Sequence, residues 1–131
     1  MSAMKELTRA EEQIMHVLWA LGRGYVKDII ERLPAPKPAY NTVSTIVRIL
    51  EKKGFVGHEA FGKTHLYHPI VAKEDYTQAF LKHFLKGYFG DSYQELVSFF
   101  ARDRNLSVSE LEDILATLRE EIKKQKAGKN V

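Results

Sequence analysis

Five short polar or basic side chains stand together in a stretch that carries no acidic residue: Asn41, Thr42, Ser44, Thr45 and Arg48. Asn41, Thr45 and Arg48 are four and three residues apart, so they share one face of a helix. Short Asn and Thr side chains can lie against base edges and thymine methyl groups, and Arg can bind a guanine or a phosphate. The pattern therefore predicts contact with DNA. The alternative is an ordinary amphipathic surface helix, which more commonly carries Glu and Lys pairs on its outer face.

A helix must hold these side chains, and the rest of the stretch predicts one from residue 38 to 53. Its apolar positions fall at helical spacing and are Val43, Ile46, Val47 and Leu50. Pro38 suits the first turn, where its missing N–H is not needed. At the other end, Lys52 and Lys53 suit the negative helix terminus, and Gly54 suits the left-handed conformation that follows.

Two runs of β-prone residues come next and flank Phe61-Gly62-Lys63, which predicts a hairpin over residues 54–69. A polar helix followed at once by a hairpin with a basic tip is typical of a winged helix-turn-helix. In that fold the helix enters the major groove of DNA, and we expect the hairpin to lie against the sugar–phosphate backbone. A winged helix could also serve as a protein-interaction module, but the acid-free polar face argues against that alternative.

Four further residues are candidates for phosphate contacts: Thr8, Lys37, Lys52 and Lys63. Lys63 lies at the hairpin tip, Lys37 precedes the polar helix and Lys52 ends it. Thr8 forms a capping box with Glu11, and helix N-termini bind anions as lysines do. Because most hairpin tips are polar, Lys63 alone is weak support for DNA binding.

Two apolar-periodic segments precede the polar helix and complete an N-terminal domain predicted to span residues 1–72. The first runs from the Thr8 cap to Leu21, and the second covers roughly residues 26–33. The prolines at 34, 36 and 38 form a stiff, non-helical connection to the polar helix.

The rest of the chain is almost purely helical and is predicted to form a dimerisation domain at residues 73–124, followed by a disordered tail at 125–131. Its candidate interface residues are Phe80, Phe84, Leu96, Phe99, Phe100, Leu111, Leu115, Leu118 and Ile122. Three short helices bury too little surface alone, so we expect them to pack against a second copy. The alternatives are packing onto the N-terminal domain of the same chain, or a small-molecule site among the aromatic residues.

Composition narrows the class of protein. The 131 residues are 44% hydrophobic and 28% charged, which fits a packed soluble domain. The net charge of +3 falls in residues 1–70, because residues 71–131 hold ten basic and ten acidic side chains. This is weak support for an anionic partner. With no Cys, no signal peptide and no membrane-spanning segment, we expect a cytoplasmic protein without membrane insertion.

No grouping of residues predicts catalysis, a cofactor or a metal site. The sequence lacks a Gly-rich phosphate loop and a nucleophile elbow, so we expect no enzyme activity. His58, His65 and His68 lie in the predicted hairpin, but imidazoles without a clear carboxylate partner make a poor zinc site. They are interpreted as structural or surface histidines.

The chain resembles the penicillinase-repressor family, also called BlaI/MecI-type regulators, in the order of its segments. These are LTRAEEQIMHVLWALG, VKDIIERLP, AYNTVSTIVRILEKKGFV, FGKTHLYHPI and GDSYQELVSFFARDRNLSVSELEDILATL. The resemblance covers residues 7 to 122. It implies a cytoplasmic homodimeric winged-helix repressor that binds palindromic operators of β-lactamase or related genes. The family's DNA-contact positions match Asn41, Thr42 and Thr45, and Asn41 replaces a lysine of the best-known members.

The resemblance also implies a mode of release. In the best-known members a membrane sensor metalloprotease responds to β-lactam, and the repressor is cut between an Asn and a Phe in its dimerisation domain. The matching dipeptide here is Ser98-Phe99, which departs from the pattern by having Ser in place of Asn. Copper-responsive relatives carry a C-terminal cysteine cluster, which this chain lacks, so the resemblance does not imply copper sensing by that route.

Overall fold

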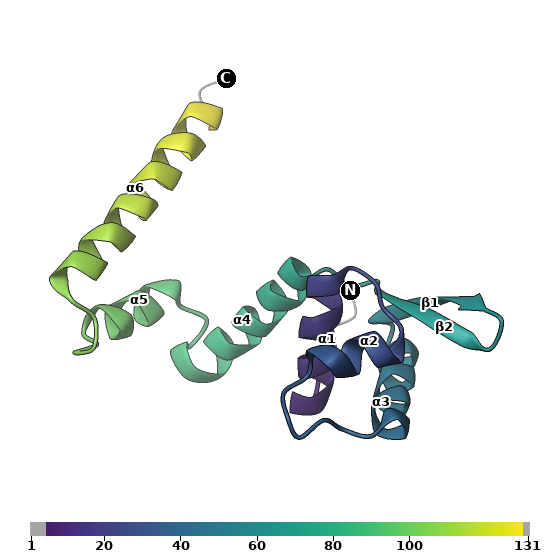
Figure 1. Cartoon of the computed structure of the whole chain (residues 1–131). Coiled ribbons are helices and arrows are strands. Elements are labelled where there is room, and N and C mark those ends of the chain that lie inside the picture. Colours follow the sequence, from purple (N-terminus) through teal and green to yellow (C-terminus); the bar gives the residue numbers. More distant parts are fainter. Residues whose placement is uncertain (1–4, 130–131) are drawn as a thin grey trace. The chain divides into compact units, whose positions relative to one another are not determined.

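A computed structural model describes residues 5–129 of the chain (Figure 1). Its elements are α1 (Arg9–Leu21), α2 (Val26–Arg32), α3 (Tyr40–Lys52), β1 (Val56–Phe61), β2 (Thr64–Pro69), α4 (Lys73–Phe89), α5 (Tyr93–Ala101) and α6 (Val108–Lys129). The two strands form an antiparallel hairpin. The predicted fold class, mainly α with a small hairpin wing, is confirmed.

The helix α1 begins at the capping box that the sequence predicted. The Thr8 hydroxyl accepts a hydrogen bond from the Glu11 N–H at 3.1 Å, and the Glu11 carboxylate accepts one from the Thr8 N–H at 2.8 Å. Two N–H groups that the first turn would leave unpaired are therefore satisfied.

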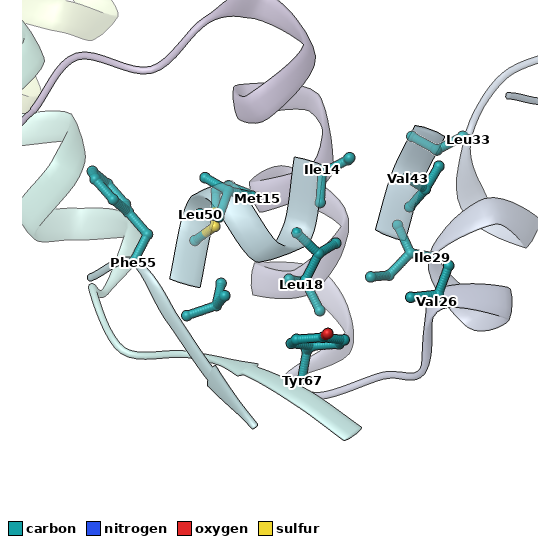
Figure 2. Close-up of a cluster of buried hydrophobic side chains, with 12 residues drawn as sticks. Ile14, Met15, Leu18, Val26, Ile29, Leu33, Val43, Leu50, Phe55 and Tyr67 are labelled. Carbon is teal, nitrogen blue, oxygen red and sulfur yellow. The ribbon is translucent and has the colours of Figure 1, made fainter. Parts of the chain in front are cut away.

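Buried side chains of α1, α2, α3 and the hairpin meet in one core. In Figure 2, Leu18 of α1 lies between Ile29 of α2, Leu50 of α3 and Tyr67 of β2. Leu18, Ile29 and Leu50 are fully buried. Burying each such side chain contributes about 1.5–3 kcal/mol, so this core fixes where α3 and the hairpin lie.

The helix α3 begins two residues later than the sequence predicted. Ala39 is its N-cap, so Pro38 lies before the helix and not in its first turn. Its end is as predicted, because Gly54 has φ +85°. The Gly54 N–H donates to Glu51 O and the Phe55 N–H donates to Leu50 O, which together make a Schellman motif.

The hairpin turns over two residues. Phe61 pairs with Thr64, which leaves Gly62 and Lys63 as the loop. Gly62 has φ +63°, a conformation that favours glycine and that a two-residue hairpin turn with Gly first requires. This turn places Lys63 at the tip.

The start of α4 packs on the N-terminal core. The Trp19 indole N–H donates to Val71 O at 2.9 Å, and the Tyr76 hydroxyl donates to the Glu12 carboxylate at 2.8 Å. Consequently the chain divides into two compact units between His83 and Phe84, inside α4, and not at the predicted boundary after residue 72. The Tyr76 and Trp19 contacts join residues far apart in the chain, so no local sequence pattern predicts them.

The second unit, from Phe84 on, holds the end of α4, with α5 and α6. Ser92 caps α5, and Ser107 forms the predicted capping box with Glu110 at the start of α6.

The predicted disordered tail is wrong for residues 125–129, because α6 continues to Lys129. Lys, Gln and Ala are good helix formers, and cations suit a helix C-terminus. Residues 130–131 of that tail lie outside the described part. Among the described residues no helix is long and apolar enough to cross a membrane.

Candidate nucleic-acid interface

The outer face of α3 carries the predicted DNA-reading side chains. Asn41, Thr42, Thr45 and Arg48 are exposed and Ser44 is half-buried, while the opposite face of the helix is buried in the core. The Thr45 hydroxyl donates back to Asn41 O at 2.8 Å. The Arg48 Nε–H lies 3.4 Å from Ser44 O, and its other donors have no partner among residues 5–129. Arg48 can therefore bind an acceptor outside the protein.

Lys63 and Lys52 are both exposed. Lys63 is at the tip of the hairpin, whereas Lys52 is in the last turn of α3. Lys63 shares the wall of a groove with Arg48, so the structure brings these two cations to one site. Lys52 does not line that groove.

This groove lies between the start of α2, the outer face of α3 and the hairpin, and its cavity volume is about 530 Å³. Its walls are Tyr25, Val26, Lys27, Tyr40, Ser44, Arg48, Lys63, Thr64, His65 and Tyr67. Three of these side chains are cationic and none is a carboxylate, so the groove favours anions. Burial raises the pKa of Tyr67, and the nearby Glu51 carboxylate adds to the rise, so Tyr67 is a neutral hydrogen-bonding group.

The histidines occupy both faces of the hairpin. His58 and His65 stack with their ring centroids 4.1 Å apart and their planes at 9°. The His58 Nδ1 lies 2.5 Å from the Glu51 carboxylate, and the Tyr67 hydroxyl oxygen lies 3.5 Å from the His65 Nδ1. His68 is on the other face, where its ring covers Gly57. No group of three or more potential ligands that could hold a metal occurs among the described residues.

Lys37, a predicted phosphate contact, makes hydrogen bonds within the protein. Its ammonium group donates to the carbonyl oxygens of Ile30, Glu31 and Leu33 at 3.2, 2.7 and 2.8 Å. An ammonium has three donors, and all three are engaged at the C-terminal end of α2. Lys37 therefore caps that helix, and we propose the interface without it.

Thr8 is also removed from the DNA-reading face. Its helix terminus already holds the Glu11 carboxylate, which lies 2.7 Å from the Lys53 Nζ at the end of α3. Asn41 is at the opposite end of α3, about 18 Å away at 1.5 Å per residue. An anion at Thr8 would meet a carboxylate already in place, so we propose the interface without Thr8.

Seven of the ten groove residues were not predicted as site residues, and Tyr40, Lys27 and His65 are among them. Tyr40 is 56% exposed and lines the groove. Its position four residues before Ser44 and eight before Arg48 is a helical signal that could have found it. For Lys27 no sequence signal exists, because α2 reaches the groove only through tertiary packing.

The predicted dimerisation residues are spread over both units. Phe80 belongs to the first and is 56% exposed, whereas Phe84 begins the second. In the second unit Phe99, Leu115, Leu118 and Ile122 are exposed by 46–62%, and no residue of α5 or α6 is buried. The remaining predicted interface residues of α5 and α6 are partly buried: Leu96, Phe100 and Leu111. Ser98 and Phe99, the candidate cleavage dipeptide, lie inside α5.

The amino-acid sequence is similar to those of known transcriptional regulators. The family model of the penicillinase repressor matches residues 7–120. The chain is 26% identical over 110 residues to the methicillin resistance regulatory protein MecI of Staphylococcus aureus (strain N315), covering 83% of this chain and 89% of that protein. It is 24% identical over 127 residues to the penicillinase repressor of Bacillus licheniformis, covering 96% and 99%.

The solved structures include one with a matching fold. The DNA-binding domain of the repressor BlaI superposes with a TM-score of 0.50 at 26% identity, over 58% of this chain and 94% of that domain. The chain therefore belongs to the penicillinase repressor family of DNA-binding transcriptional regulators.

Proposed function

We propose that this protein is a repressor that binds a palindromic operator as a homodimer in the cytoplasm. The observation that carries the proposal is the outer face of α3, which is exposed, polar and free of acids, with Arg48 sharing a groove with Lys63 of the hairpin. A helix of this kind fits the major groove, and a basic hairpin tip fits the sugar–phosphate backbone. Similarity to a penicillinase repressor and to the DNA-binding domain of the repressor BlaI supports the repressor part of this proposal.

Base recognition is assigned to the first two turns of α3. Asn41, Thr42 and Thr45 are short and exposed, so they can approach base edges closely, while Arg48 can reach a guanine. Lys52 and Lys63 contact phosphates and fix the orientation of the protein on the duplex. Ser44, half-buried beside Arg48, lies where the groove begins.

Dimerisation is assigned to the second unit because its helices leave a large apolar surface uncovered in one chain. Leu111, Leu115, Leu118 and Ile122 follow one another at steps of four, three and four residues, so they form one stripe along α6. About half of the side-chain surface of Leu115, Leu118 and Ile122 is exposed. A second copy can cover this stripe, and a two-fold dimer then presents two reading helices at half-sites about one helical turn apart.

Release from the operator is proposed to follow loss of the dimer, because a single DNA-binding domain makes few phosphate contacts. Proteolysis at Ser98-Phe99 by a membrane sensor metalloprotease would act in this way, on operators of β-lactamase-type or related genes. Both residues are helical, so a protease that needs an extended substrate can cut only after α5 unwinds locally.

The test is binding of the full chain to labelled fragments that include the region upstream of its own gene, measured against salt concentration. We expect a tight complex at a palindrome with two chains per site, and an affinity that falls steeply as salt rises. Weak binding without sequence preference would refute the repressor assignment.

Dimerisation is tested separately by Leu118→Asp, with Ala116→Asp on the opposite side of α6 as the matched control. A buried unpaired charge is costly, so we expect the first variant to sediment as a monomer and to lose tight operator binding, and the second to keep both properties. A monomeric Leu118→Asp chain that still binds the full operator tightly would contradict the dimer assignment.

A further inference from the structure

The groove beside α3 contains a titratable group that the proposed function has not used. His65 lines the groove together with Arg48 of α3 and Lys63 of the hairpin tip, and Lys27 comes from the start of α2. Its ring is exposed to solvent, and its strand neighbour across the hairpin is Ala60. His65 is therefore within reach of any anion that enters the groove.

His65 also has a second imidazole against it. The stack with His58 holds the two ring centroids 4.1 Å apart, and the Glu51 carboxylate contacts the Nδ1 of His58. His58 therefore has a carboxylate partner. A proton on His65 has no carboxylate partner among the groove walls.

The charged and titratable groups that face His65 come from every element around it. They are His58 of β1, Lys63 of the hairpin loop, Tyr67 of β2, Arg48, Glu51 and Tyr40 of α3, Lys27 of α2, and Tyr25, the N-cap of α2. Three of the groove walls are cationic and none is a carboxylate. An oxygen anion in the groove would attract these cations, and it would attract an imidazolium at His65 in the same way.

We propose that the groove holds a phosphate of the operator strand, and that His65 contacts it as an imidazolium, so that binding to DNA takes up a proton. This inference rests on the proposed function and names a further contact of the same site. Phosphate contacts carry no sequence information, so the uptake occurs on any duplex that the protein binds. Affinity should rise as pH falls through the range where imidazoles gain protons, between about pH 8 and 6.

The size of the effect follows from linkage. Uptake of one full proton changes the dissociation constant tenfold per pH unit, and partial uptake changes it less. We expect binding about three- to tenfold tighter at pH 6 than at pH 8 for the full chain at constant ionic strength. His65→Gln keeps a polar side chain but cannot be charged, so it should match the wild type at pH 8 and be weaker at pH 6.

The experiment measures fluorescence anisotropy of the full chain with an operator duplex and with a random duplex, at pH 6, 7 and 8 and fixed ionic strength. Calorimetry in two buffers of different ionisation enthalpy counts the protons directly. The control is His68→Gln, which changes the same residue type on the opposite face of the hairpin. His58→Gln reports whether the other imidazole of the stack takes the proton.

Proton uptake that is lost in His65→Gln and kept in His68→Gln would support the proposal. Uptake that survives in His65→Gln, or that is lost only in His58→Gln, would overturn it. An equal loss of affinity at all three pH values would also overturn it, because that result indicates a structural role. Operator preference without pH dependence would refute this inference alone, whereas pH-dependent binding without operator preference would refute the repressor assignment alone.

Discussion

Replacing Lys53 with Met tests how α3 is held in place. The Lys53 Nζ lies 2.7 Å from the Glu11 carboxylate. This ion pair joins the C-cap residue of α3 to the first turn of α1. The Lys53 and Glu11 side chains are 24% and 7% exposed, so this ion pair is largely removed from water. Met keeps most of the aliphatic stem and removes the ammonium group, with its charge and its hydrogen-bond donors.

The magnitude follows from what remains at Glu11. Its carboxylate would keep the hydrogen bond from the Thr8 N–H but lose its counter-charge. A hydrogen bond to a charged group contributes about 1.5–3 kcal/mol, and loss of one partner of a fully buried pair costs about 3–5 kcal/mol. Because Lys53 is partly solvated, we expect the free energy of unfolding to fall by about 2 kcal/mol.

The pair also makes stability depend on pH. Burial by itself would raise the pKa of Glu11, but the Lys53 ammonium and the hydrogen bonds at Thr8 outweigh it and hold this pKa below its ordinary value. A carboxyl group with a lowered pKa stabilises the fold above its unfolded pKa of 4.5, and the contribution is lost as pH falls through the folded value. In Lys53→Met this acid-dependent loss should be smaller.

The assay is urea unfolding followed by the fluorescence of Trp19, the single Trp of the chain, which lies in α1. A double-mutant cycle with Glu11→Gln isolates the coupling, and Lys52→Met, an exposed neighbour, is the control. The reasoning would be refuted by a loss below about 0.5 kcal/mol, or by an equal loss in the Glu11→Gln background.

Three further predictions concern single side chains. Lys37→Met should lower the free energy of unfolding by about 1–2 kcal/mol through uncapping α2, without changing the salt dependence of DNA binding; a reduced salt slope in titrations would show a phosphate contact instead. Arg48→Ala should weaken operator binding by about 1–3 kcal/mol and relax preference at one base pair, and unchanged anisotropy curves would remove Arg48 from the interface. Burial and the hydrogen bond to Glu12 raise the pKa of Tyr76 to about 12, so its contribution to stability is present below pH 10 and lost towards pH 12. In urea unfolding, Tyr76→Phe should abolish this fall in stability at alkaline pH. An unchanged dependence on pH would contradict the assignment to Tyr76.

The amino-acid sequence by itself determined the local elements and the reading face. The capping boxes at Thr8 and Ser107, the glycine at 54 and the two-residue turn at Gly62 all depend on neighbours a few residues apart. The face of α3 follows from helical spacing alone. Such signals are local, so they can be recognised without knowledge of the rest of the fold.

Only the tertiary structure decided which distant groups meet. Lys37 and Thr8 were predicted as phosphate contacts, and the tertiary structure gives them partners within the protein: the carbonyl oxygens of α2 for Lys37, and the Glu11–Lys53 pair beside Thr8. Contacts across the core likewise moved the boundary between the units into α4 and brought Lys27 and His65 to one groove with Arg48. The pairing of donors and charges across such distances depends on how helices pack, and periodicity within one segment carries no information about it.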